Sequence, residues 1–317
     1  SNPAFYKNNH TTNVYGGELQ ATTNVLGGTT SFGFEYSQDK IESNNLGEHS
    51  RIKQGFFAEQ LIRISQQLNF SIGGFAHNYS NFGWNFWPGF DLSYSPINSL
   101  KLFANYGRAF RIPTYTELYY NDPVTLGNAN LKQEESTNYE IGVNYLWESI
   151  KVNSTIFRKE GTNLIDWVLN ESNAIWIADN ITKVNTTGFE LGLNFILDDN
   201  DFYGIFSQLN IDYTYLNSDK IQTEFLSRYV LEHLRHDLSI SLFNNLPFEI
   251  NQSWTFNYED RVSLKDHYTI DTKLMKQFSN FNVFIMASNL LNKSYEEIPG
   301  VPLPGRWIIG GVRLNIL

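Results

Sequence analysis

The sequence predicts an all-β fold, a transmembrane antiparallel β-barrel, with about fifteen strands in this chain. Three observations carry this prediction: apolar and polar residues alternate along many segments, short turns alternate with longer connections, and aromatic residues are abundant. Aromatic residues make up 15% of the 317 residues, and charged residues make up only 18%. This composition is typical of strands rather than of helices.

The alternation is strictest in the segments 138–145, 189–195 and 209–215, where every second residue is apolar. Strict alternation places apolar side chains on one face of a strand and polar side chains on the other. We expect lipid to contact Tyr139, Ile141, Phe189, Leu191, Leu209 and Ile211, and the lumen to be lined by Glu140, Asn194 and Asp212. A soluble β-sandwich is the alternative, but its strands are rarely this long.

The connections between these segments differ in length. Short turns are expected near residues 27, 67, 147, 199, 245 and 280, and longer connections near 38–50, 111–136, 159–183, 216–232, 259–266 and 291–305. Outer-membrane barrels have short periplasmic turns and longer extracellular loops. We therefore expect the short turns to share one rim, and counting the segments between connections gives about fifteen strands.

Several classes of function are disfavoured by composition and motifs. The chain has no cysteine and a formal charge of −10. It therefore has no thiolate ligand or thiol nucleophile, and its acidity argues against a nucleic-acid partner. It contains no apolar run of about 18 residues that would make a transmembrane helix, and no GxSxG, P-loop or HExxH motif. We expect no catalytic residue, no metal site and no cofactor; a barrel protease or lipase is the enzymatic alternative.

Two longer segments carry a family resemblance. GRAFRIPTYTELYY (107–120) is followed by GNANLKQEESTNYEIGV (127–143), and NLLNKSYEEIPGVPLPGRWIIGGVRL occupies 289–314. They resemble the mid-barrel pattern and the C-terminal box of TonB-dependent outer-membrane receptors. The matching residues include Arg111, Pro113, Glu117, Gly127, Asn128, Glu134, Gly305 and Arg306. We interpret these residues as mainly structural, because proline ends strand pairing and glycine permits backbone conformations that other residues resist.

The resemblance also implies location and partners. It implies the outer membrane of a Gram-negative bacterium, contact with outer-membrane lipid, energy-coupled import through TonB, and a surface lipoprotein as a further partner. Barrels of this family have about 22 strands around a plug. Residues 1–317 are therefore expected to form a single domain, the C-terminal part of such a barrel, as a fragment without the plug region that contacts TonB.

The ligand is predicted from the expected loops. Aromatic residues in them are candidate ligand contacts: Tyr115, Tyr119, Tyr120, Trp167, Trp176 and Tyr229. Such aromatic clusters favour a bulky ligand, and packing of loop against loop is the alternative. Basic and acidic loop residues are balanced, which favours a neutral, amide-rich ligand over an anionic ferric siderophore. PTYTELYYNDP, NLIDWV and RYVLEHLRH also resemble corrinoid (vitamin B12) receptors of the Bacteroides type. A corrinoid receptor is thus predicted, with a ferric-siderophore receptor and a passive porin or adhesion barrel as alternatives.

Overall fold

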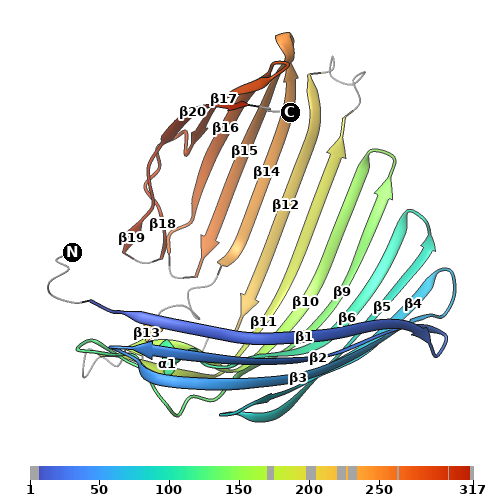
Figure 1. The fold of residues 1–317 in the computed structure, drawn as a ribbon. Helices are drawn as coiled ribbons and strands as arrows, with labels where there is room; N and C mark the ends of the chain where they lie inside the picture. The colour runs from blue at the N-terminus through green and yellow to red at the C-terminus, as the bar shows by residue number, and fades with distance from the viewer. Residues whose placement is uncertain are drawn as a thin grey trace.

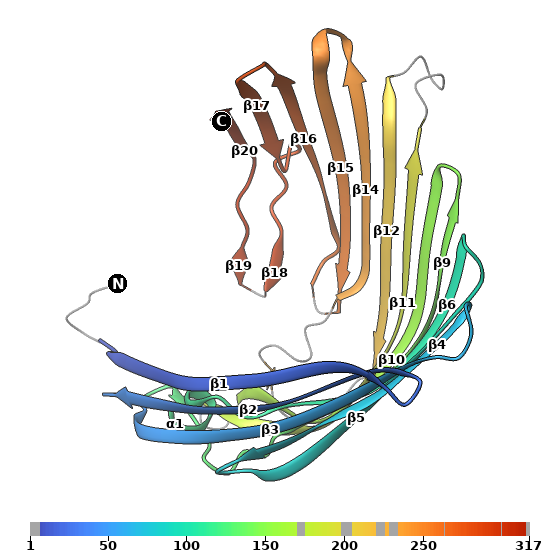
Figure 2. The same cartoon turned by 45° about the vertical axis from the view of Figure 1, so that its right-hand side comes forward.

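A computed structural model describes residues 7–169, 175–197, 205–219, 226–227, 234–262, 264–298 and 300–314. Within these ranges, fifteen strands of eight or more residues pair antiparallel in sequence order and form one strongly curved sheet (Figures 1 and 2). The edge strands β1 and β20 lie apart, so the sheet is open (Figure 2). The predicted fold class and the predicted strand number are confirmed.

The long strands of the first half of the chain are β1 (His10–Val25), β2 (Gly28–Ser43), β3 (Gly47–Arg63), β4 (Leu68–Tyr79), β5 (Gly83–Ile97), β6 (Leu100–Arg111), β9 (Glu134–Trp147) and β10 (Ile150–Leu169). Those of the second half are β11 (Trp176–Ile196), β12 (Phe206–Ser218), β14 (Leu234–Leu246), β15 (Ile250–Arg261), β16 (His267–Gln277), β17 (Phe281–Ser288) and β20 (Trp307–Leu314).

Short elements lie between the long strands. They are α1 (Tyr115–Tyr119), β7 (Asn121–Asp122), β8 (Thr125–Leu126), β13 (Leu226–Ser227), the 3-10 helix η2 (Pro247–Glu249), β18 (Glu296–Ile298) and β19 (Val301–Pro302). β8 pairs parallel with the start of β11, and β13 pairs with the end of β10. None of the helices in the described ranges is both long enough and apolar enough to cross a bilayer.

Tight turns join alternate strand pairs. β1–β2, β3–β4, β5–β6, β9–β10, β14–β15 and β16–β17 are each connected by no more than four residues. Because every long strand is antiparallel to the next, these turns lie on one rim. The prediction of a short-turn rim is confirmed for the described turns, whereas the expected turn near 199 lies outside the described residues.

Two of the expected long connections are wrong. β2 continues to Ser43 and β3 begins at Gly47, so 38–50 is a hairpin with a three-residue tip. Likewise β10 runs to Leu169 and β11 starts at Trp176, so most of 159–183 is strand. A strand needs only about ten residues to cross the apolar layer, and β10 has 20. The outer part of β10 extends beyond the apolar layer, so its two faces do not contact lipid and the lumen. It therefore lacks the alternation of apolar and polar residues that identifies a membrane strand in the sequence.

Strand register separates the two predicted faces. Glu190 pairs with Thr214, which pairs with Asp237, and Asn194 donates to Asn210 (2.5 Å) on the same polar face. The opposite face is apolar, as in the cross-strand row Ile156, Phe189, Tyr215. The residues expected to face lipid thus lie opposite those expected to face the lumen.

Phenylalanine side chains also occur on the polar face. Phe103 lies over Gly142 on the neighbouring strand, and Phe157 lies over Gly188, where an added Cβ would collide with the ring. Glycine therefore allows each ring to lie flat against the sheet, as in the aromatic rescue of strand glycines. This arrangement keeps bulky rings from projecting far from the polar face.

The buried apolar side chains lie in the half of the molecule away from the short-turn rim. Among the described residues they are Ile41, Leu46, Trp87, Leu118, Leu131, Ile165, Ala178, Ile181 and Val184. The loop between β6 and β9 supplies two of them and passes between the outer parts of β3 and β10. This region is where the motif residues and most of the aromatic candidates meet.

Candidate functional site

The β6–β9 loop begins with a capped helix. Thr114 is the N-cap of α1: its hydroxyl oxygen accepts from the Glu117 backbone N–H (3.2 Å), and its own N–H donates to the Glu117 carboxylate (2.7 Å). This reciprocal arrangement is a capping box, whose Thr-x-x-Glu signature is visible in the sequence. It fixes the start of the helix directly after Pro113, which is fully buried. The helix was not predicted, although this signature could have revealed it.

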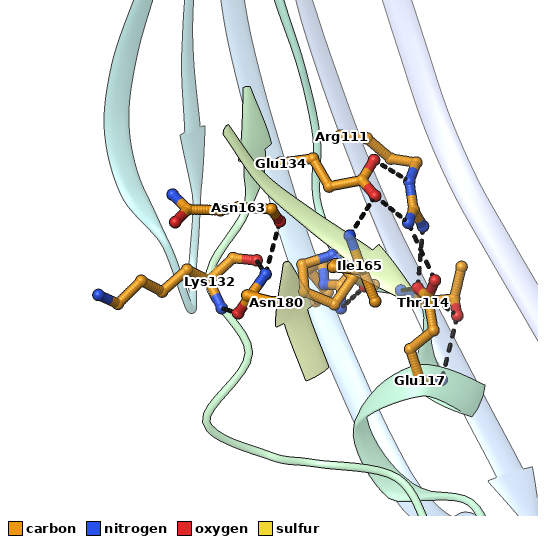
Figure 3. Close-up of polar contacts among 10 residues, drawn as sticks. Arg111, Thr114, Glu117, Lys132, Glu134, Asn163, Ile165 and Asn180 are labelled. Carbon is orange, nitrogen blue, oxygen red and sulfur yellow. Dashed lines mark hydrogen bonds and ion pairs between the residues drawn. The ribbon is translucent and has the colours of Figure 1, made fainter. Parts of the chain in front are cut away.

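Arg111 joins two carboxylates at the base of this helix (Figure 3). Its guanidinium donates twice to Glu134, at 2.6 and 2.8 Å, and twice to Glu117, at 2.9 Å each. Glu134 also accepts from the backbone N–H of Ile165 on β10 (2.7 Å). Paired, charge-assisted hydrogen bonds of this kind are strong and directional. The cluster therefore ties together the end of β6, α1, the start of β9, and β10.

The same contacts set the protonation of the cluster. Burial alone would raise the pKa of Glu117, but hydrogen bonds from Arg111 and Thr114 outweigh it and hold the pKa below its ordinary value. The hydrogen bond to Glu134 is the largest influence that raises the pKa of Arg111 above its ordinary value. The Glu117 carboxylate and the Arg111 guanidinium are therefore both charged at neutral pH.

Asn180 fixes the loop to the β10–β11 hairpin (Figure 3). Its side-chain oxygen accepts from the Lys132 N–H (2.8 Å), and its amide nitrogen donates to the carbonyls of Lys132 (3.0 Å) and Asn163 (2.6 Å). The side chain thus bonds to the backbone of segment 129–133, which does not pair with β11, and to the neighbouring strand β10 at Asn163, where the register skips a residue. Neither asparagine was predicted, because an isolated asparagine gives no pattern in the sequence.

Gly127 and Asn128 fold the loop back onto α1. The Gly127 N–H donates to the Tyr120 carbonyl (2.6 Å), and a Cβ on Gly127 would lie 2.7 Å from the backbone nitrogens of Tyr119 and Tyr120. The Asn128 N–H donates to the Glu117 carbonyl (2.8 Å). These two motif residues therefore permit and fix a close approach of backbone to backbone.

The opposite side of α1 rests on the β2–β3 hairpin. Arg51 donates to the Pro113 carbonyl (3.1 Å) and lies 4.8 Å from the Tyr115 ring centre. His49 stacks on Tyr119 with 3.6 Å between ring centres. Burial is the largest of the influences that raise the pKa of Tyr115 to about 12, so this phenol is neutral at physiological pH. Arg51 and His49 were not predicted, since they lie more than sixty residues away in sequence from the groups they contact.

A small apolar core completes this unit. Leu118, Leu131, Ile165 and Ala178 are buried together, with Tyr119 and Trp167 packed against them. We call residues 112–133, with the outer parts of β2, β3, β10 and β11 that they contact, the loop platform. The β2–β3 hairpin tip also joins it, because the Asn45 side chain donates to the Asn121 carbonyl (2.7 Å).

Most of the aromatic candidates are brought together in the loop platform. Tyr115, Tyr119 and Trp167 pack within it as described above. The Tyr120 N–H caps α1 by donating to the Thr116 carbonyl (3.0 Å), and the Trp176 N–H donates to the Val124 carbonyl (2.9 Å). Tyr229 lies outside the described residues. The packing gives the first three rings a structural role, and their contact with a ligand stays a prediction.

Gly305 and Arg306 lie in a different loop, between β17 and β20. The Arg306 backbone N–H donates to the Asn292 side-chain oxygen (2.8 Å), and a Cβ on Gly305 would lie 2.6 Å from that oxygen. Asn289, buried at φ 48°, accepts from the Lys293 N–H (2.9 Å) and donates to the Lys293 carbonyl (2.8 Å). The described contacts of Gly305 and Arg306 are therefore made within this loop, and the mainly structural role of the C-terminal box stays a prediction.

Many of the charged side chains away from the short-turn rim form ion pairs. Arg108 pairs with Glu135 (3.1 Å) and Arg158 pairs with Glu160 (2.9 Å). Further pairs join Lys53 to Glu35, Arg235 to Asp260 and Arg261 to Glu259. In the described part of the chain, no three histidine or carboxylate side chains are grouped so that they could hold a metal ion.

Curated relatives of the chain include transporters. It is 26% identical over 275 residues to the vitamin B12 transporter BtuB of Photobacterium profundum, a match that covers 83% of this chain and 43% of that protein. It is 25% identical over 181 residues to the probable hemoglobin and hemoglobin-haptoglobin-binding protein 4 of Haemophilus influenzae, covering 54% of this chain and 16% of that protein. The chain therefore spans less than half the length of these relatives.

Solved structures share the fold. The siderophore receptor PirA from Pseudomonas aeruginosa superposes with a TM-score of 0.77 at 19% identity, covering 96% of this chain and 55% of that one. The FrpB iron transporter from Neisseria meningitidis gives a TM-score of 0.74 at 16% identity, with 96% and 55% covered. The family described as TonB dependent receptor-like, beta-barrel, matches residues 1–289. The chain belongs to this family of TonB-dependent receptor β-barrels.

Proposed function

We propose that the protein containing this chain is a high-affinity receptor that imports a scarce, bulky nutrient across the outer membrane of a Gram-negative bacterium, without catalysis. Membership of the TonB-dependent receptor family supports this proposal. Energy would come through TonB and a plug domain inside the barrel, and the apolar face of the sheet would contact outer-membrane lipid. A surface lipoprotein that delivers ligand remains part of the proposal as a further partner.

We further propose a cobalamin-like corrinoid as the ligand. The observation that carries this choice is the similarity to a vitamin B12 transporter across 83% of the chain. The charges of the loop platform support it, because the Arg111 guanidinium is paired with two carboxylates and Arg51 contacts the Pro113 carbonyl and the Tyr115 ring. Anionic ligands are typically bound by arginines that are not already paired in this way.

Equilibrium binding to the complete receptor tests the proposal. Purified receptor is titrated with cyanocobalamin and, separately, with ferric siderophores, at low and high salt. We expect saturable cyanocobalamin binding that changes little with salt, because a near-neutral ligand gains little from charge steering. Binding of a ferric siderophore in place of cyanocobalamin, with strong salt dependence, would reject the corrinoid assignment and favour the siderophore alternative.

A further inference from the structure

A pocket opens beside the loop platform. It has a volume of about 420 Å³ and lies between the β4–β5 turn, α1 and the segment 129–133. Asn81 and Phe82 line one side, Leu118 and Tyr119 line the second, and residues 129–133 line the third. It therefore gathers three stretches of chain on the side of the sheet opposite the short-turn rim.

The walls of this pocket are held in place before any ligand arrives. α1 is fixed by its capping box and by Arg111, and segment 129–133 is fixed by Asn180 and by the buried Leu131. Gln133 links that segment to β5, because its amide nitrogen donates to the Asn85 side-chain oxygen (2.9 Å). A preformed site loses less conformational entropy on binding than a mobile loop does.

The chemistry of the lining is amide and aromatic. Phe82 and Tyr119 supply apolar surface over the buried Leu118 and Leu131, whereas Asn81, Asn130 and Gln133 carry side-chain amides. The lining contains one cation, Lys132, and no carboxylate; the Lys132 side chain extends away from the Arg111 cluster (Figure 3). Amides both donate and accept, so they match another amide better than they match an anion.

One polar atom at this site lacks a partner. The side-chain oxygen of Gln133 is shielded from solvent and accepts no hydrogen bond from any described residue, although the amide nitrogen of the same side chain makes two. Buried acceptors are normally paired. Solvent does not reach this oxygen, so a ligand N–H supplies the missing donor only when the Gln133 side chain turns toward the pocket.

We propose that this pocket binds an amide-bearing side arm of the ligand, with the arm's methylenes against Phe82 and Tyr119 and its amide among Asn81, Asn130 and Gln133. The inference rests on the proposed function, and it deepens it by naming the chemical group that is recognised. In this proposal the polar contacts come from the amide residues. The aromatic candidate Tyr119 contributes packing surface.

Filling the pocket tests the inference in the complete receptor. Asn81→Trp places bulk at an exposed turn residue of the pocket. Val301→Trp is the matched control, because Val301 is also exposed, lies in the loop between β17 and β20, and does not line the pocket. We expect Asn81→Trp to weaken cyanocobalamin binding about tenfold or more, and Val301→Trp to leave it within about twofold. Asn130→Leu, which removes an exposed amide, should weaken binding severalfold.

A modified ligand distinguishes recognition of the side-arm amide from simple filling of the pocket. Cyanocobalamin monocarboxylic acids, in which one side-arm amide is hydrolysed to a carboxylate, should bind the wild-type receptor more weakly than cyanocobalamin does. Asn81→Trp should reduce that discrimination for the derivative whose altered arm enters the pocket. Unchanged affinity in Asn81→Trp, or equal loss in Val301→Trp, overturns the pocket inference alone. Failure of the wild-type receptor to bind cyanocobalamin overturns both this inference and the corrinoid proposal.

Discussion

The strand wall near the short-turn rim and the loop platform are stabilised in different ways. In the wall, adjacent strands pair over long, regular registers, and the buried apolar side chains of the described residues lie elsewhere. In the loop platform, a four-residue apolar core, two guanidinium groups and two asparagines hold segments that are far apart in sequence. Backbone ladders therefore organise the wall, and individual side chains organise the platform.

This difference teaches where single substitutions should act. A substitution in the wall should act chiefly through the face on which the residue lies, because one face contacts lipid and the other lines the lumen. A platform residue matters through its particular partners, because removing it leaves buried groups unpaired. The three expectations below follow from the comparison, from the largest effect to the smallest.

Placing a charged side chain on the apolar face should have the largest effect. Leu191 lies on the apolar face of β11 and is the cross-strand neighbour of Tyr213 on β12. Leu191→Arg should destabilise the barrel by about 2–4 kcal/mol, because an arginine near the middle of the bilayer loses its hydration. The measurement is reversible folding of the receptor into lipid vesicles.

The control for that substitution lies on the polar face. Thr214 sits between Glu190 and Asp237 in the cross-strand register. Thr214→Arg should therefore cost less than about 1 kcal/mol, since the new charge meets carboxylates and not lipid. Equal destabilisation by both substitutions would contradict the assignment of the two faces.

Breaking the Arg111 cluster should have a smaller effect, confined to the platform. Arg111→Ala leaves the Glu117 and Glu134 carboxylates, which are 14% and 17% exposed, without their main partner. Loss of a fully buried pair costs about 3–5 kcal/mol, but Arg111 itself is 42% exposed, so about 2 kcal/mol of local stability is expected. Hydrogen exchange and limited proteolysis should both increase in 112–133.

Arg158→Ala is the matched control for this substitution. The Arg158–Glu160 pair is more open to solvent, with side chains 51% and 33% exposed. Such pairs are typically worth about 0–1 kcal/mol, so protection of 112–133 should be unchanged. If Arg111→Ala leaves that segment as protected as Arg158→Ala does, the cluster does not hold the platform together.

Acid should produce the smallest change. The pKa of Glu117 in the folded protein is below its ordinary value of 4.5. Its contribution to stability is therefore complete above that ordinary value and is lost as the pH falls through the folded-state pKa. Hydrogen exchange, corrected for its intrinsic pH dependence, should show that 112–133 becomes less protected as the pH falls from 6 to 3.

The variant Glu117→Gln checks the origin of this acid effect. It cannot titrate, so its platform should already be looser at neutral pH and should respond less to acid. An acid response as large as that of the wild type would assign the effect to a group other than Glu117.

The arrangement of the wall was largely predictable, whereas that of the platform was not. Alternation in segments such as 189–195 revealed the faces, but 38–50 and 159–183 were read as loops because their outer strands do not alternate. The motif residues Arg111, Glu117 and Glu134 were recognised, yet the sequence did not show that one guanidinium serves both carboxylates. The sequence did not show that the aromatic residues Tyr119 and Trp167 pack against a core, and their contact with a ligand stays a prediction.

The sequence by itself determined the fold class, the strand number and the rim of short turns, because a boundary between lipid and water imposes a period of two on every strand that crosses it. That signal is local and repeats along the chain. Only the tertiary structure decided which residues meet in the loop platform: Arg51 and Pro113 are 62 positions apart, and Asn45 and Asn121 are 76 apart. Contacts at such separations depend on how hairpins fold over one another, and they leave no periodic trace in the sequence.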